Sequence, residues 1–292
     1  MGWVNSQAGH TQLSAPPRWL CAGLLCLLVA ACQQQNEPVV AGTALMQSVL
    51  QDVLGGETVP AVLIPPGSCP GHYDMRPSDI ERVARCEALL LHPWQSDMPN
   101  VTSVIRASGI APERVYVVPA QGNWMVPEAY ADALEAVADV LAANGLDGGG
   151  AAVRAAERSA ESRALGDTLQ ARLIAAGTPE VSVLCNDMIA PFAEWAGFSV
   201  AGVFGRSEDL SVGDVEALVR LGKISDVVLI IDNMQSGDEK MGAVLARETG
   251  AERVILSNFP GGLPSTGTWN LAVKRNAELI LDALERVAQS AQ

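Results

Sequence analysis

The chain has 292 residues, of which 49% are hydrophobic, and 33 acidic against 19 basic residues give a formal net charge of −14. The apolar content is sufficient for one large domain or two lobes of ordinary size. The acidic balance argues against nucleic acid as a partner, because affinity for nucleic acid comes mainly from Lys and Arg side chains that neutralise phosphates.

The N-terminus has the pattern of an export signal. Arg18 precedes an apolar run over residues 19–30, shorter than the roughly 20 residues that span a bilayer, and small residues follow it. The sequence Val-Ala-Ala-Cys ending at Cys32 resembles the lipobox of bacterial lipoproteins. We therefore expect a signal peptide over residues 1–31, lipidation of Cys32, and a polar tether over residues 32–40. An ordinary signal peptide with a chance cysteine is the alternative.

Apolar runs of strand length then alternate with amphipathic segments of helix length. In the first half we expect helices at residues 41–54, 80–86, 101–108 and 127–144, and strands at residues 59–64, 88–92 and 114–119. In the second half we expect strands at residues 181–185, 199–204, 226–231 and 253–256, and helices at residues 189–196, 212–221, 240–249 and 272–288. Such alternation predicts parallel sheets with right-handed crossovers.

One long helix divides these two halves. Residues 151–176, rich in Ala, Arg, Glu and Leu, predict a helix of roughly 39 Å at 1.5 Å per residue. We expect an α/β fold with an N-terminal lobe over residues 41–145, a linking helix over residues 146–177, and a C-terminal lobe over residues 178–292. Each lobe is a parallel βα sheet, and the ligand cleft lies between the lobes at the strand ends. A surface helix within one domain is the alternative.

The loop at residues 67–79 follows the first predicted strand and carries a thiol, Cys69, and an imidazole, His72. These side chains suit a soft or borderline metal, although a C-x-x-H pair is only half of a metal site. A solvated loop with an incidental histidine is the alternative.

Three cysteines remain after removal of the leader: Cys69, Cys86 and Cys185. An odd number of cysteines in an oxidising compartment means that at least one is free, binds metal or pairs between molecules. We expect Cys86 to be a small buried apolar residue.

Several segments then match a known pattern in order and spacing. Residues 71–79, Gly-His-Tyr-Asp-Met-Arg-Pro-Ser-Asp, look like P-H-x-Y-E-x-x-P-S-D, and residues 124–127 look like H-V-W-L-D-P. Residues 185–187 with Phe192 are similar to S-H-D-A-F, and residues 248–251 and 268–276 look like E-T-G-A and T-Y-x-x-x-x-x-x-N. Over essentially the whole mature chain, the sequence resembles the solute-binding lipoproteins of zinc and manganese ABC importers.

This resemblance implies a monomeric receptor, lipid-anchored on the periplasmic side of the cell envelope, that delivers a transition metal to an ABC permease in the inner membrane. Zinc is the expected cargo, with manganese and iron as the alternatives. An enzyme is disfavoured, because the chain has no Ser-His-Asp order and no nucleotide-binding glycine loop. An envelope hydrolase that uses the Cys–His pair and an adhesin are the distant alternatives.

The expected metal ligands of this family, three histidines and a carboxylate, are absent from the matching positions. Ungapped matching places Gly71, Gly122, Asn186 and Asn258 there. An asparagine offers only a neutral carbonyl oxygen, which is a weak ligand for zinc.

Two interpretations remain open. In the first, soft donors at strand ends replace the missing ligands and bind zinc or another late transition metal; the donors are Cys69, His72, Cys185 and Asp232. A Cys69–Cys185 disulfide would compete with this site. In the second, a neutral polar pocket takes a chelated metal or a small organic solute. The pocket residues that we expect are His92, Asn123, Trp124, Asn186, Asp187 and Asn258.

Overall fold

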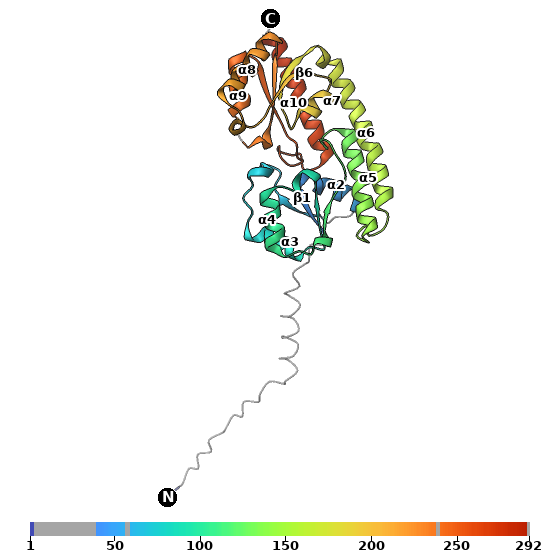
Figure 1. Cartoon of the computed structure of the whole chain (residues 1–292). Coiled ribbons are helices and arrows are strands. Elements are labelled where there is room, and N and C mark those ends of the chain that lie inside the picture. Colours follow the sequence, from blue (N-terminus) through green and yellow to red (C-terminus); the bar gives the residue numbers. More distant parts are fainter. Residues whose placement is uncertain (3–38, 56–58, 238–239, 291–292) are drawn as a thin grey trace. The chain divides into compact units, whose positions relative to one another are not determined.

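The structure is a computed structural model that describes residues 1–2, 39–55, 59–237 and 240–290. Residues 37–292 form one compact unit (Figure 1). The predicted signal peptide, the lipidation site Cys32 and most of the predicted tether lie outside the described residues. None of the described helices is both long and apolar enough to cross a membrane.

The N-terminal lobe is built on a four-stranded parallel sheet in the order β2-β1-β3-β4. Its strands are β1 (Val39–Thr43), β2 (Ala61–Ile64), β3 (Ala88–Leu91) and β4 (Val115–Val117), and its helices are α2 (Ala44–Leu54), α3 (Pro77–Arg85), α4 (Pro99–Ser108) and α5 (Pro127–Ala143). Alternate residues of β3 face opposite sides: Leu89 and Leu91 pack with α3 and α4, while Ala88 and Leu90 belong to the core that α2 and α5 cover. The sheet is therefore buried on both faces, as parallel sheets are.

The C-terminal lobe repeats this arrangement in the order β6-β5-β7-β8. Its strands are β5 (Ser182–Asn186), β6 (Ser199–Phe204), β7 (Leu229–Asn233) and β8 (Glu252–Leu256), and its helices are α7 (Ala190–Trp195), α8 (Val212–Ile224), α9 (Lys240–Thr249) and α10 (Trp269–Ser290). In each sheet the first strand of the lobe lies between the second and the third. The chain thus reverses its winding direction at the same place in both lobes, and that place, at the carboxyl ends of the strands, is where open α/β sheets bind ligands.

The predicted two-lobed α/β fold is confirmed, with one correction near its start. The sequence predicts a helix from residue 41, whereas residues 39–43 form strand β1 and the helix α2 begins at Ala44. Thr43 ends the strand and caps the helix, because its hydroxyl accepts a hydrogen bond from the Met46 amide at 3.2 Å. The predicted tether is correspondingly shorter at its C-terminal end.

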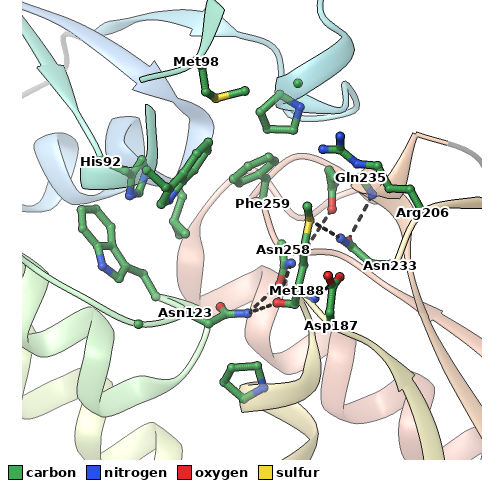
Figure 2. A pocket seen from close by; sticks show the side chains of 17 residues that line it. His92, Met98, Asn123, Asp187, Met188, Arg206, Asn233, Gln235, Asn258 and Phe259 are labelled. Carbon is green, nitrogen blue, oxygen red and sulfur yellow. Dashed lines mark hydrogen bonds between the residues drawn. The ribbon is translucent and has the colours of Figure 1, made fainter. Parts of the chain in front are cut away.

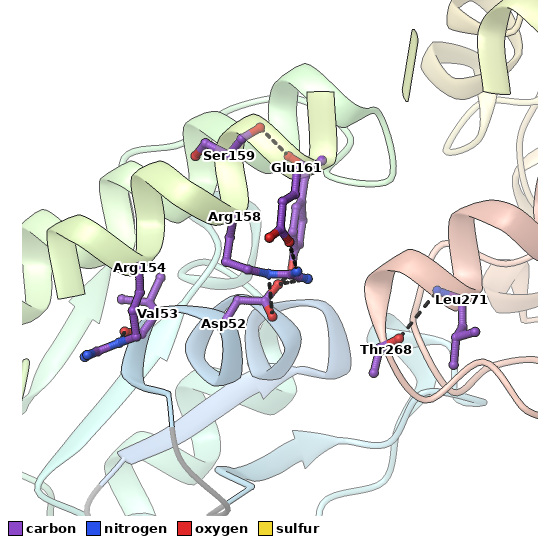
Figure 3. Close-up of polar contacts among 10 residues, drawn as sticks. Asp52, Val53, Arg154, Arg158, Ser159, Glu161, Thr268 and Leu271 are labelled. Atoms are coloured by element: carbon purple, nitrogen blue, oxygen red, sulfur yellow. Dashed lines mark hydrogen bonds and ion pairs between the residues drawn. The ribbon is translucent and has the colours of Figure 1, made fainter. Parts of the chain in front are cut away.

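The linking helix α6 (Ala151–Ala175) is packed along its length rather than standing free between the lobes. It runs beside α5 and continues toward α7 of the second lobe (Figure 1). Two arginines tie it to α2 (Figure 3): Arg154 Nε donates to the Val53 carbonyl at 2.7 Å, and Arg158 Nε lies 3.2 Å from Asp52 Oδ1. Farther along, Gln170 donates to the Trp195 carbonyl at 2.6 Å, which joins α6 to the end of α7.

The two lobes share one apolar core behind the strand ends. This cluster includes buried residues of both sheets, such as Leu90 and Ile231. Trp269 at the start of α10 stacks on Tyr130 of α5, with ring centroids 4.3 Å apart, and its indole N–H donates to the Trp124 carbonyl at 2.8 Å. The lobes are therefore joined by side-chain packing as well as by the chain.

Candidate solute-binding cleft

A cleft of about 540 Å³ lies where the carboxyl ends of the two sheets face each other (Figure 2). Each of the eight strands is followed by a loop or helix start that contributes to its lining. From the N-terminal lobe come Leu45, Pro70, Gly71, His92, Trp94, Met98, Gly122, Asn123 and Trp124. From the C-terminal lobe come Asp187, Met188, Pro191, Arg206, Asn233, Gln235, Asn258 and Phe259.

The wall on the N-terminal lobe is aromatic. His92 follows β3 and stacks on Trp94, with the two ring centroids 5.1 Å apart. The centroid of the Trp124 ring lies 4.0 Å from that of His92. The His92 Nε2 and Thr43 Oγ1 atoms form a hydrogen bond of 2.8 Å. Burial lowers the pKa of His92 to about 3, because desolvation disfavours the charged imidazolium. His92 is therefore a neutral part of this wall at physiological pH.

The floor of the cleft consists of side-chain amides that connect the lobes. Asn123 of the N-terminal lobe donates to the Met188 carbonyl at 2.8 Å and to Asn258 Oδ1 at 2.9 Å (Figure 2). Asn258 itself donates to the Met188 carbonyl at 3.1 Å, and its backbone N–H donates to Gln235 Oε1 at 2.9 Å. Gln235 reaches back across the cleft through Nε2, which donates to the Pro66 carbonyl at 2.9 Å.

Asp187 and Arg206 are the lining residues that carry a full charge. One carboxylate oxygen of Asp187 accepts the Met188 amide hydrogen bond at 2.8 Å. The Arg206 Nε atom is buried and has no hydrogen-bond partner among the described residues. Its guanidinium lies beside Gly71, where a Cβ atom would be only 3.0 Å from one of its nitrogens. The absence of a side chain at Gly71 thus lets the cation reach the opposite lobe.

Cys69 and His72 are neighbours, as their spacing predicts, but they line a separate pocket of about 560 Å³ with Met234 and Gly237. His72 Nε2 pairs with Glu208 Oε1 of the other lobe at 3.1 Å, in a half-exposed position. A Cβ at Gly237 would lie 2.8 Å from His72 Nδ1 and 3.5 Å from Cys69 Sγ, so the backbone of the C-terminal lobe closes over this pair.

Cys185 and Asp232 lie elsewhere. Cys185 is inside strand β5, fully buried in the shared core, and burial with the nearby Glu194 and Asp187 carboxylates raises the pKa of its thiol to about 12. Asp232 is buried and accepts two hydrogen bonds from Arg253, from Nη2 at 2.6 Å and from Nε at 3.0 Å. A thiol this basic is a poor source of the thiolate that binds metal, and the carboxylate already has a cationic partner.

The predicted four-ligand metal site therefore has to be corrected. Cys69 and His72 adjoin each other, but Cys185 and Asp232 do not join them, and the described part of the chain holds no group of three or more His, Cys, Asp or Glu side chains that could bind a metal. Cys69, Cys86 and Cys185 are free, so the competing Cys69–Cys185 disulfide is not formed either. Cys86 is fully buried, as expected.

Five of the six predicted pocket residues line the cleft, and the sixth, Asn186, does not. His92, Asn123, Trp124, Asp187 and Asn258 line the cleft. Asn186 lies behind it, buried, where its Oδ1 accepts the Met188 amide hydrogen bond at 3.1 Å and so orients the loop that carries Met188. Sequence reasoning missed Arg206 and the carboxyl-terminal positions Asn233 and Gln235. Arg206 and Gln235 follow β6 and β7, and Asn233 is the last residue of β7. Sequence reasoning could have found them, because the carboxyl ends of parallel strands meet at one edge of the sheet.

Comparison with known families agrees with this geometry. The family model described as "Zinc-uptake complex component A periplasmic" matches residues 39–283. The chain belongs to this family. The resemblance to solute-binding proteins of zinc and manganese importers is thereby confirmed. Comparison with curated protein sequences found no significant match.

Solved structures share the fold at low sequence identity. The solute-binding protein FpvC of Pseudomonas aeruginosa, solved with Ni²⁺, has a TM-score of 0.68 at 19% identity over 85% of this chain and 97% of its own. A ZnuA crystal structure gives 0.67 at 18% identity, over 84% of this chain and 98% of its own. A Mn-bound periplasmic metal-binding protein of Candidatus Liberibacter asiaticus gives 0.68 at 13% identity, over 84% and 98%.

Within this family, the positions that match the expected metal ligands are those around the cleft. Gly71, Gly122 and Asn258 line it, and Asn186 supports its floor. The positions that sequence matching predicts for the family's ligands therefore lie at the cleft, and they carry glycines and amides.

Proposed function

We propose that this protein is the extracytoplasmic receptor of an ABC importer and that a transition metal of the zinc or manganese class is its cargo. The observation that carries the proposal is the cleft between the two sheets, at the carboxyl ends of all eight strands. Sequence matching predicts the family's metal ligands at the same place. Membership of the zinc-uptake family supports the metal class.

The proposal includes a place and a partner. We infer that the mature chain acts as a monomer on the periplasmic side, held by a lipid on Cys32, and that it docks on an inner-membrane permease. The Val-Ala-Ala-Cys sequence and the preceding apolar run support the lipid anchor. Family membership supports the permease.

The test is metal uptake in cells that lack this chain. We expect uptake of at least one of zinc, manganese and iron to fall, and a copy of the wild-type chain to restore it. A Cys32→Ala copy should appear in the soluble fraction without a lipid label. Unchanged uptake of all three metals would contradict the receptor role, and a Cys32→Ala protein that stays in the membrane fraction would contradict the anchor.

The amide floor favours a second candidate, a small neutral polar solute without metal. Asn123, Asn258 and Gln235 present hydrogen-bonding groups without charge, which is the chemistry of a neutral polar site. Such a receptor would leave metal uptake unchanged and would carry a metal-free organic molecule after purification.

A further inference from the structure

The cleft does not provide a coordination shell for a bare metal ion. A zinc site needs about four N, S or O ligand atoms that face one point. Carboxylate and thiol ligands must be deprotonated, and imidazole ligands must be neutral. The described lining offers one imidazole, whose Nε2 is already bonded to Thr43, and one carboxylate, Asp187. The remaining polar groups are amides, several of which are committed to one another across the floor.

The two full charges of the described cleft lining, on Asp187 and Arg206, are of opposite sign, so the lining has no excess negative charge that would attract a bare cation. Arg206 is a lining residue with a permanent positive charge, and no acidic cluster accompanies it among the described lining residues. A divalent ion close to Arg206 would be repelled by this guanidinium, and the repulsion is strong where water is partly excluded. An anion is attracted for the same reason.

Arg206 has donor capacity that the chain leaves unused. Its Nε atom is buried without a hydrogen-bond partner among the described residues, and a buried unpaired donor is costly. A guanidinium presents its N–H groups as a planar fork that matches a carboxylate in a bidentate pair. A carboxylate, a common group of small organic metal chelators, therefore fits beside Arg206.

The opposite wall fits an organic molecule. Trp94 is 47% exposed and stacks on His92, and the buried Trp124 lies behind the same wall. Flat aromatic surfaces take rings and apolar groups. A volume of about 540 Å³ lies in the range of small-molecule sites and far exceeds the roughly 30 Å³ of one water molecule.

We propose that the metal enters this cleft already held by a small organic chelator, and that Arg206 binds a carboxylate of that chelator. The proposal rests on the proposed function, because it names the form in which the metal cargo arrives. The chelator supplies the coordination shell that the chain lacks. The aromatic wall packs against the chelator.

Two measurements test this inference on the full chain. The first is analysis of the natively purified protein for metal by elemental analysis and for small molecules by mass spectrometry after denaturation. The second is calorimetric titration with Zn²⁺ alone, with the zinc complexes of histidine and of citrate, and with each chelator alone. We expect metal and chelator to be released together, and at least one complex to bind at least about tenfold tighter than Zn²⁺ or the chelator alone.

The Arg206→Gln variant identifies the residue responsible. Loss of a charged hydrogen-bonding partner should weaken binding of the complex by about tenfold or more. Arg220→Gln is the matched control, because Arg220 is an exposed arginine of the same lobe outside the cleft. Thermal unfolding of each variant checks that the fold is retained. A fully folded Arg206→Gln variant with unchanged affinity would overturn the role of Arg206.

The remaining outcomes separate this inference from the proposed function. Tight binding of Zn²⁺ alone, or release of metal without any chelator, would overturn the inference and leave the metal receptor standing. Release of an organic molecule without metal would overturn both. If nothing is released and none of the probes binds, both are overturned as well.

Discussion

His92 is the lining residue whose chemistry is most altered by its surroundings. Its ring is packed between two tryptophans and bonded to Thr43, and burial lowers its pKa to about 3. The unfolded chain would titrate this imidazole near the ordinary pKa of about 6.5. Between these two pH values the unfolded state binds a proton that the folded state does not, so the stability of the fold falls as the pH falls.

The first consequence is a pH dependence that belongs to one residue. From pH 7 to pH 5 we expect the free energy of unfolding to drop by about 2 kcal/mol through His92 alone, at 1.36 kcal/mol for each pH unit of uncompensated proton binding. Urea titrations of the wild type and of His92→Gln at pH 5, 6 and 7 measure this. The variant should lose most of the slope in this window, and the two proteins should show equal slopes above pH 7. Parallel slopes between pH 5 and pH 7 would contradict the neutral, buried imidazole.

The contacts of single residues also explain why the metal ligands could not be predicted correctly from the sequence. Position near a strand end was predictable for Cys185 and Asp232, but the partner of each side chain was not. Cys185 lies within β5 on the side of the shared core, together with Val183, because alternate residues share a face. Asp232 meets Arg253 because β7 and β8 are adjacent in the sheet, and strand order is set by the whole lobe. Both contacts depend on residues distant in sequence.

At the scale of elements, the sequence was sufficient to predict helix α6 but not strand β1. The bounds of α6 could be predicted from composition, because a long run rich in helix-forming residues lies between Gly150 and Gly177. Up to Gly166, its buried face is a stripe of small residues at helical spacing: Ala151, Ala155, Ser159, Ser162 and Gly166. That stripe lets α5 approach closely, and Ser159 Oγ donates to the Ala131 carbonyl at 3.1 Å. Strand β1, in contrast, was missed, because its five buried residues run directly into α2 with no loop between the two elements.

Gly166 is a position of close approach between α5 and α6. A Cβ there would lie 2.5 Å from both Cβ and Cγ of Pro127, whose ring cannot rotate away. Gly166→Ala gains up to about 1 kcal/mol in helix propensity and loses about 1–3 kcal/mol through overpacking. We expect the overpacking to win, with a net loss of about 1–2 kcal/mol in the free energy of unfolding. Thr168→Ala, at an exposed position of the same helix, should change it by less than about 0.5 kcal/mol. A Gly166→Ala variant more stable than the wild type would show that the helices separate at little cost.

At the scale of the whole molecule, several contacts connect the two lobes. The shared apolar core joins them behind the cleft, the Asn123–Asn258 hydrogen bond joins them at its floor, and the His72–Glu208 pair joins them at its rim. The core contact is the most resistant to change, because sliding one lobe over the other would separate the stacked rings of Tyr130 and Trp269. The predicted architecture of two lobes and a linking helix is thus present, but packing between lobes makes residues 37–292 one compact unit.

This packing predicts that the receptor changes shape little when it is loaded. Domain closure by a free hinge would shorten the molecule by several ångströms, whereas lobes with a common core can only rock slightly. We expect small-angle scattering of the full chain to give radii of gyration that differ by less than about 1 Å with and without saturating cargo. The matched variant is Trp269→Ala, which removes both the stack on Tyr130 and the hydrogen bond to the Trp124 carbonyl and should cost about 3–5 kcal/mol of stability. Loosened in this way, the variant should show a larger change on loading than the wild type. A contraction of several ångströms in the wild type, or an identical response in both proteins, would mean that the shared core does not restrain the lobes.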